Sequence, residues 1–565
     1  MVLAALKRWI PAIEWMGSYK KAQWLQDGSA GLTTAVMLVP QGMAYALLAG
    51  LPPILGLYAS TLPLVLYSLF GTSRQLAVGP VAMVSLLVLS SASAIAAPGS
   101  SEFITAAIFL ALLVGVFQVG LGLLRAGFLV NFLSHPVISG FTSAAALVIG
   151  MSQVKHLTGL PLSSTHSIFG SFLEIFQKIG EIHTTTLLIG IGSMATLLLL
   201  RRFAPKFPRF LVVVVLSTLV VWLFGLHNKG VAIVASVPQG LPDVVFPLFS
   251  TELLVRLWPA AMTIALVGFM ESVSVAKAFA SKHRYEIRPN QELIALGLAN
   301  IGSSILGALP VTGGFSRTAV NDQAGARSPM AALVTATVII LVLVALTPLF
   351  YYLPKTTLAA IILVAVAQLV DIAEIKHLWH VKRADLALLV FTFVATLVLG
   401  IEEGIGLGVG ASLLWFVVRT TRPHTAILGR LPGTTVYRNL LRFPEAKAVD
   451  GVLILRIDAQ FYFGNVSFLK ETLHKTLTDT KPTPHTVIID ASSINELDSS
   501  ADAALHEIAE FLEQAHIKLY FASVKGPVRD VMQRSGFWEK LGVDRFVFDI
   551  HDAVVAATKL PKGSS

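Results

Sequence analysis

Two short segments of this chain carry glycine, proline and small hydroxyl residues directly before a new apolar run. They are residues 71–80 (GTSRQLAVGP) and 310–317 (PVTGGFSR). This composition predicts helices that stop and restart within a hydrophobic stretch. The start of a helix exposes unpaired N–H groups and the positive end of its dipole. Two such starts facing one another would attract an anion, as in a transporter's substrate site.

The residues at these two starts are the first candidates for substrate binding. After Pro80, the backbone N–H groups of Val81 and Ala82 are available. In the second segment the start contains Phe315 and Ser316, and the Ser316 hydroxyl can cap the helix or contact the ligand. Ordinary proline kinks, which are common in transmembrane helices, would give a similar pattern.

Arg317 follows Ser316 directly. A cation in the middle of a membrane is costly, so it is expected to face a cavity or a partner. It would attract the anion electrostatically. The alternatives are a structural ion pair, for example with Asp322, or a side chain that reaches the cytoplasmic surface.

Two further positions offer polar groups within apolar segments. Gln41 and Tyr45 lie four residues apart and therefore on one helix face, just after Pro40, which we expect to disrupt that helix. Glu271 is the only formal charge between Arg256 and Lys277. A lone buried carboxyl group of this kind is a candidate proton carrier; the alternative is a structural carboxylate paired with Arg or Lys.

The composition indicates a polytopic membrane protein. Of 565 residues, 55% are hydrophobic and 13% are charged, and mean hydropathy is +0.73; a soluble domain has about 25% charged residues. The absence of cysteine excludes disulfides, thiolate metal sites and cysteine catalysis. No P-loop, G-x-S-x-G, H-E-x-x-H or EF-hand pattern is present. We therefore expect no enzyme, no cofactor and no metal site, and we see no signal peptide.

Hydropathy predicts fourteen membrane segments, two of them short. They are 32–50, 54–70, 78–97, 103–124, 132–153, 184–200, 210–226, 259–276, 292–309, 315–322, 330–353, 356–370, 386–401 and 404–418. An even number of crossings puts both termini on one side. With seven segments in each half and one interruption in each, we expect an inverted repeat.

Basic residues identify the side on which the termini lie. Residues 1–429 hold 26 Lys+Arg against 16 Asp+Glu, whereas residues 430–565 hold 16 against 17. With fourteen crossings, the basic clusters fall on one face, which the positive-inside rule makes the cytoplasm. They include Lys7, Arg8, Lys20, Lys21, Arg74, Arg125, Arg201, Arg202, Lys206, Arg284, Arg288, Lys382 and Arg383. We expect a multi-pass protein of the inner (cytoplasmic) membrane with cytoplasmic termini and no nucleic-acid partner.

The C-terminal part changes character. Residues 452–457, 486–490 and 518–522 are predicted strands, and residues 466–477, 499–514, 528–535 and 552–559 are predicted helices. This alternation predicts a small cytoplasmic α/β domain. We divide the chain into a transmembrane domain, 1–429, and this domain, 430–565, with a frayed tail from residue 561.

Several long motifs, in order, resemble the SulP family (sulfate permeases and anion exchangers) with its STAS domain. They are residues 39–60, 71–82, 290–321 (NQELIALGLANIGSSILGALPVTGGFSRTAVN) and 497–505 (LDSSADAAL). The resemblance implies fourteen helices in two inverted repeats, with a core bundle that carries the anion past a gate bundle. Gln41 and Tyr45 would line its cavity. The STAS domain would mediate homodimer contacts and regulation.

The resemblance also bears on coupling and regulation. Sodium-coupled relatives place Asp at the position of Glu271 and Thr four residues later; Val275 stands here, which favours protons over sodium. In related anti-sigma antagonists, the serine equivalent to Ser500 is phosphorylated. The alternative is that Asp498 and the serines cap the following helix.

We therefore expect an elevator-type, proton-coupled anion transporter that forms a homodimer in the lipid bilayer, with a regulatory protein partner on the STAS domain. Sulfate, bicarbonate and C4-dicarboxylates remain open as substrates. Three alternatives stay open: an uncoupled chloride/bicarbonate exchanger or channel-like pathway, a nucleobase carrier, and a membrane sensor that signals through the STAS domain. Arg317 and the STAS domain argue against the nucleobase carrier.

Overall fold

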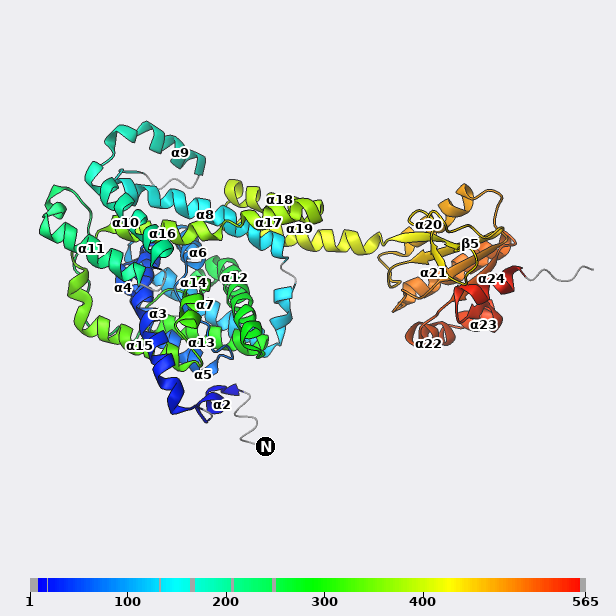
Figure 1. Cartoon of the computed structure of the whole chain (residues 1–565), viewed down its shortest axis with the longest axis horizontal. Helices are drawn as coiled ribbons and strands as arrows, with labels where there is room; N and C mark the ends of the chain where they lie inside the picture. The colour runs from blue at the N-terminus through cyan, green and yellow to red at the C-terminus, as the bar shows by residue number, and fades with distance from the viewer. Residues whose placement is uncertain are drawn as a thin grey trace, which may run out of the picture. The chain divides into compact units, whose positions relative to one another are not determined.

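The chain folds into two compact units, Met1–Ser412 and Leu413–Ser565 (Figure 1). The computed structural model describes residues 9–17, 19–131, 134–162, 168–204, 208–245 and 250–558. The basic residues Lys7, Arg8 and Lys206 and the predicted tail from residue 561 lie outside these ranges. Each unit is described by itself.

The first unit is helical. Its helices are α2 (Ala12–Gly17), α3 (Lys21–Leu48), α4 (Pro53–Tyr58), α5 (Leu62–Phe70), α6 (Ala82–Ser93), α7 (Ser101–Leu123), α8 (His135–Thr158), α9 (Ile168–Gln177), α10 (Thr184–Phe203), α11 (Arg209–Leu223), α12 (Thr251–His283), α13 (Pro289–Ile305), α14 (Phe315–Gln323), α15 (Met330–Leu341), α16 (Lys355–Val366), α17 (Ile372–Val381), α18 (Arg383–Leu399) and α19 (Ile401–Thr421). The last of these continues into the second unit.

Each of the fourteen predicted membrane segments overlaps a helix of this unit. Within the described residues, nine helical stretches are long and apolar enough to cross a membrane. The other predicted segments coincide with shorter helices, namely α6, α11, α13, α14 and α18. The count of fourteen crossings therefore stays a prediction. Helices α2, α9 and α17 were not predicted.

Two predicted segments differ in detail. Pro40 lies inside α3, which runs on to Leu48, so the expectation that this proline disrupts the helix is wrong; a helix can lose one backbone hydrogen bond when its neighbours pack around it. The predicted segment 54–70 is divided into α4 and α5 by a turn at Ala59–Thr61.

The two interrupted segments meet. Val78–Gly79 (β1) pairs antiparallel with Thr312–Gly313 (β2), with Val78 opposite Gly313 and Gly79 opposite Thr312. Each short strand leads into a helix start, α6 after β1 and α14 after β2. The sequence placed one break in each half of the chain; the structure pairs their backbones directly.

Helices α7 and α13 pack closely against one another. A Cβ added to Gly115 on α7 would lie 2.7 Å from the Gly297 carbonyl oxygen on α13, whereas a Cβ on Gly120 would meet no atom within 4 Å. The two helices therefore approach through small residues, as membrane helices commonly do. Helix α13 in turn contacts the second interrupted segment, because Asn300 Nδ2 donates to the Val311 carbonyl at 3.0 Å.

Gly115→Ala is expected to destabilise the protein by about 1–3 kcal/mol, because overpacking forces backbones apart. Gly120→Ala, on the same helix, should leave stability unchanged or slightly higher, since alanine favours helix over glycine. Thermal unfolding of the two purified variants in detergent checks this. Equal midpoints for the two variants would contradict the close approach.

The second unit is a six-stranded sheet with helices on both faces. The strands are β3 (Thr425–Arg430), β4 (Tyr437–Asn439), β5 (Val452–Ile457), β6 (Thr486–Asp490), β7 (Lys518–Ala522) and β8 (Phe546–Val547), in the order β4-β3-β5-β6-β7-β8. β5 to β8 are parallel, and β3 is antiparallel to both its neighbours. The predicted strands 452–457, 486–490 and 518–522 are confirmed.

Successive side chains of a strand point to opposite faces of the sheet. Each face therefore packs against its own set of helices. Leu453, Leu455, Val487 and Phe521 pack with α20 (Val466–Asp479), α21 (Ser499–Gln514), α22 (Gly526–Arg534) and α23 (Phe537–Leu541). The opposite face packs on α24 (Ile550–Thr558).

The predicted boundary between residues 429 and 430 falls inside β3, which pairs with β5 and so belongs to the sheet. The compact units divide earlier, at 412/413.

Ser500 lies exposed in the first turn of α21. Asp498 caps that helix, accepting a hydrogen bond from the Ala501 N–H at 2.8 Å, and also accepts one from the Phe463 N–H at 2.7 Å. The capping interpretation of Asp498 is therefore confirmed. Phosphorylation of Ser500 stays a prediction.

Candidate functional site

Two helix starts without side-chain caps face a common region of the first unit. Val81 is the N-cap of α6 and Gly314 is the N-cap of α14, and neither end receives a side-chain cap. The first N–H groups of each helix have no intrahelical acceptor. Both ends therefore carry unpaired donors and a positive partial charge.

Hydrogen bonds fix the backbone on each side of the β1–β2 pair. The Gly314 N–H donates to the Ala77 carbonyl at 3.1 Å. The Thr318 hydroxyl accepts from the Ala77 N–H at 3.1 Å and donates to the Gly314 carbonyl at 2.8 Å. The two helix starts are thus positioned by one another.

Side chains of α12 secure the second break. The Thr312 hydroxyl donates to the Gly268 carbonyl at 2.6 Å and lies 2.6 Å from the Ser272 hydroxyl. Ser272 in turn accepts from the Gly313 N–H at 2.8 Å. Because Gly268, Ser272 and Glu271 share α12, this helix sets the position of Glu271 relative to the break.

Arg317 links the two breaks. Its side chain is 1% exposed, and its guanidinium donates to the Pro80 carbonyl of the first break and, at 3.5 Å, to the Thr312 carbonyl of the second. The alternative ion pair with Asp322 is wrong, because Asp322 pairs with Lys282 at 2.6 Å and with His283. The charge of Arg317 therefore lies at the helix starts.

A cavity of about 180 Å³ lies at the helix starts. A site for one water molecule needs about 10–15 Å³ of such cavity volume. The cavity therefore has room for a small oxyanion together with water. The cavity is lined by Gln41, Tyr45, Val81, Ala82, Met83, Glu271, Gly314, Phe315, Ser316, Arg317, Ala365, Val366, Gln368 and Leu369. All eight of the residues predicted for substrate binding or coupling are in this set; Ser500, the predicted regulatory residue, belongs to the other unit.

Buried polar atoms without a partner gather around this cavity. Within the described residues, the Gln41 side-chain oxygen and nitrogen, Glu271 Oε2 and Arg317 Nε are buried and make no hydrogen bond. Buried polar groups in native proteins nearly always have a partner. Unpaired donors and acceptors around one cavity indicate a ligand or water that they bind.

Among the described residues that line the cavity, Glu271 is the only acidic one. No ion pair joins it to a cation in the described part of the chain, so the alternative of a structural ion pair is not supported. No group of three or more His, Cys, Asp or Glu with metal-binding geometry occurs among the described residues.

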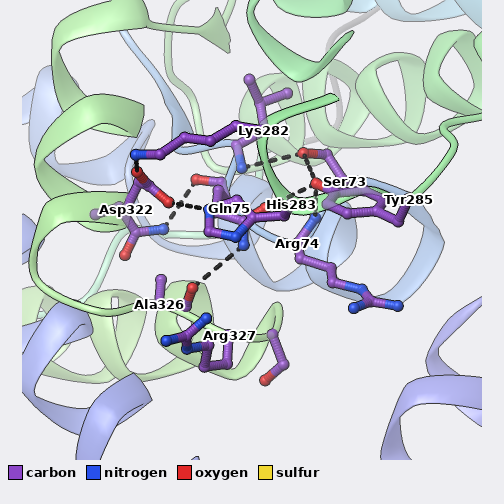
Figure 2. Close-up of polar contacts among 12 residues, drawn as sticks. Ser73, Arg74, Gln75, Lys282, His283, Tyr285, Asp322, Ala326 and Arg327 are labelled. Atoms are coloured by element: carbon purple, nitrogen blue, oxygen red, sulfur yellow. Dashed lines mark hydrogen bonds and ion pairs between the residues drawn. The ribbon is translucent and has the colours of Figure 1, made fainter. Parts of the chain in front are cut away.

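A polar network at the far end of α14 ties this half-helix to the first break (Figure 2). The Tyr285 hydroxyl donates to Gln75 Oε1 at 2.7 Å, and Gln75 Nε2 donates to the Ala326 carbonyl at 3.2 Å. Asn321 Nδ2 donates to the Gln75 carbonyl at 2.9 Å. Beside them, Asp322 binds Lys282 and His283 at the end of α12.

The sequence analysis did not identify the far wall of the cavity or this network. Ala365, Val366, Gln368 and Leu369 come from the end of α16 and the 3-10 turn after it. Of these residues, only Gln368 stands out in the sequence, because it is a polar residue at the end of an apolar segment. Gln75 and Tyr285 are more than 200 positions apart, and no local pattern links them.

Comparison with known proteins identifies the family. Residues 25–392 match the sulfate permease family, and residues 443–555 match the STAS domain. The chain belongs to the sulfate permease family. The membrane domain and STAS domain expected from the sequence motifs are thereby confirmed, and the chain is a multi-pass helical membrane protein.

Individual relatives cover most of the chain. It is 40% identical to "Sulfate transporter 4.1, chloroplastic" of Arabidopsis thaliana, over 98% of this chain and 83% of the relative. It is 38% identical to human "Solute carrier family 26 member 6", over 83% of this chain and 65% of the relative.

Solved structures share the fold. The inward-facing murine Solute Carrier 26 family member A9 anion transporter superposes with a TM-score of 0.91 at 27% identity, covering 99% of this chain and 95% of that one. The transmembrane domain of the cyanobacterium bicarbonate transporter BicA matches with a TM-score of 0.60 at 22% identity, over 70% of this chain and 98% of that one, and shows the fold alone.

Proposed function

We propose that this protein is a secondary active transporter of a small anion, bound between the starts of α6 and α14. The observation that carries this proposal is the gathering of two uncapped helix starts, the Arg317 charge and unpartnered polar atoms at one cavity. Positive helix ends and a guanidinium favour an anion. The names of the relatives favour sulfate within this class.

In this proposal the backbone N–H groups of Val81, Ala82, Phe315 and Ser316 bind the anion's oxygens. Arg317 supplies charge while it keeps the two breaks together. Gln41 can donate or accept, and Tyr45 forms an apolar wall with a polar tip. Oxygens of different anions can use the same donors, so sulfate, bicarbonate and a C4-dicarboxylate all remain candidate substrates.

Glu271 is the proposed proton carrier. It lies on the same cavity as Arg317 and has an unpaired buried oxygen. A carboxyl group there that takes up a proton would offset the anion's charge during transport, and would couple uptake to a proton gradient.

An elevator-like movement is supported by how the helices pack. Helix α7 packs on α12 and α13, while α8 packs on α16 and α18. The cavity has walls from both groups, α12 on one side and the end of α16 on the other. Movement of the first group past the second would carry the bound anion across the bilayer.

The remaining expectations belong to this proposal. The chain would cross the inner (cytoplasmic) membrane fourteen times as a 7+7 inverted repeat, with both termini in the cytoplasm. It would work as a homodimer, in which the STAS domain mediates contacts and binds a regulatory protein. Ser500, exposed on α21, would be the site of a regulatory phosphorylation.

Side-by-side uptake into proteoliposomes tests this function. We expect radiolabelled sulfate, bicarbonate or a C4-dicarboxylate to accumulate, and to accumulate faster when the external pH is below the internal pH. Uptake that ignores the pH gradient would favour the uncoupled exchanger or channel. Failure of all three anions to enter, together with a tightly bound protein partner, would favour the sensor.

A further inference from the structure

A second polar cavity lies away from the substrate site, and its lining residues adjoin those of an apolar groove. The groove follows the seam along which α3 packs on α15, and the polar cavity lies at the end of this seam, where Gln23 of α3 and residues 328–329 before α15 line it. We propose that this seam binds an anionic phospholipid, with the phosphate headgroup among arginines and an acyl chain in the groove.

The polar cavity, of about 550 Å³, has a basic lining. It is lined by Pro11, Glu14, Trp15, Tyr19, Gln23, Gly71, Thr72, Arg74, Tyr285, Glu286, Arg288, Arg327, Ser328 and Pro329. Three arginines stand against two carboxyl groups in this set. The balance favours an anion.

Two of these guanidinium groups are available. Neither Arg74 nor Arg327 has an ion-pair partner within the described residues, and both are exposed. Arg74 lies over the Tyr285 ring, 4.8 Å from its centre, and Figure 2 shows both arginines near the Gln75 network. The Arg327 backbone is fixed by its N–H bond to Asp27 at 2.6 Å. Planar guanidinium groups suit the oxygens of a phosphate.

The groove beyond the cavity is apolar, with about 570 Å³ of space. It is lined by Trp24, Leu25, Gly28, Ser29, Leu32, Met330, Leu333, Val334, Thr337 and Val338. Gly28 leaves it open, because a Cβ there would meet no atom within 4 Å. At Gly31 the helices close, since a Cβ would lie 2.5 Å from the Ala331 carbonyl oxygen.

The two hollows are lined by consecutive residues on both walls. On α3 the lining passes from Gln23 to Trp24, and on the other wall from Pro329 to Met330. A basic end joined to an apolar groove matches a phospholipid's charged head and hydrocarbon tail. A soluble phosphate would use only the first half of the site.

Aromatic residues place this junction at the membrane interface. Trp15, Tyr19 and Trp24 line the two hollows, and tryptophan and tyrosine concentrate at headgroup depth. Trp15 Nε1 also donates to the Ser68 carbonyl at 3.2 Å, which ties α2 to α5. Basic pockets between helices on a cytoplasmic face are typical sites for anionic headgroups.

Native mass spectrometry of the full-length protein tests the proposal. Detergent-purified protein would be incubated with equal amounts of dioleoyl phosphatidylglycerol and dioleoyl phosphatidylcholine. We expect selective retention of phosphatidylglycerol. The double variant Arg74→Gln/Arg327→Gln should retain about tenfold less. Gly28→Leu adds a side chain to the groove at a position where a Cβ has open space, and should also reduce retention about tenfold.

Matched control variants test whether any loss of charge or added bulk lowers lipid retention. Arg202→Gln removes one exposed charge from α10, and Gly192→Leu adds bulk at an exposed glycine of the same helix, where a Cβ also has open space; both should retain lipid as the wild type does. Equal retention of the two lipids, or unchanged retention in both site variants, would overturn the proposal. Glycerol phosphate that competes as strongly as the lipid would also overturn it, in favour of a soluble-phosphate site. Uptake activity is not the readout, so the result stands apart from the transport proposal.

Discussion

Arg317→Met is expected to reduce anion uptake by at least about 100-fold. The substitution removes the charge at the helix starts and leaves the Pro80 and Thr312 carbonyls without their donor. Removing one member of a buried charged contact costs about 2–5 kcal/mol, and each 1.4 kcal/mol is a factor of ten. Uptake of radiolabelled sulfate into proteoliposomes measures the loss.

Two controls separate loss of binding from loss of fold. Arg256→Met on α12 removes an exposed arginine that pairs with Glu252 at 3.2 Å, and should retain wild-type uptake. Arg317→Lys keeps the charge but has no planar fork to bridge two carbonyls, so it should recover only part of the activity. Wild-type uptake by a correctly folded Arg317→Met protein would remove Arg317 from the site.

Glu271→Gln is expected to abolish proton-driven accumulation while the protein still exchanges anion for anion. Glutamine has the shape of the protonated carboxyl group but cannot release and take up a proton. The shape of the cavity is therefore preserved, while the coupling to protons is lost. The measurement is sulfate accumulation with and without an inward proton gradient, together with exchange of labelled for unlabelled sulfate at equal pH. At least a tenfold loss of the gradient's effect, about 1.4 kcal/mol, is expected.

Glu252→Gln is the matched control on the same helix. Its carboxyl group is 73% exposed and pairs with Arg256, so the change should leave coupling intact. Gradient-driven accumulation by Glu271→Gln at the wild-type level would show that protons are carried elsewhere or not at all. The site would then be better explained as part of an exchanger or channel-like pathway.

Much of the fold followed from local patterns. Long apolar runs predicted the helices, and glycine and proline marked both breaks. In the STAS domain the runs VLILRI, TVIID and KLYFA predicted three strands with their observed ends. Local composition determined these elements because the membrane or the sheet core buries whole runs of side chains.

The features that the sequence did not predict depend on contacts between distant segments. β3 was missed because TAILGR directly follows an apolar helix and becomes a strand only by pairing with β5. Pro40 was expected to break a helix that its neighbours in fact hold together. The partners of Arg317 are backbone carbonyls from two distant breaks, and no side-chain pattern encodes such a contact.

The predicted site residues came together because the breaks themselves marked the site. Gln41 and Tyr45 followed from helical spacing and from the family resemblance, and Glu271 followed from its isolation in an apolar run. Gln368 could not be placed, because only the packing of α16 brings it to the same cavity.

The most direct test of the account is a cryo-EM map of the full-length protein in nanodiscs with saturating sulfate. The account predicts density for the anion within hydrogen-bonding distance of the N–H groups at the starts of α6 and α14, beside Arg317. If this density disappears when sulfate is removed, a trapped lipid or detergent molecule is excluded as its source. Density for sulfate only elsewhere, with the two helix starts occupied by protein side chains, would contradict the proposed binding mechanism.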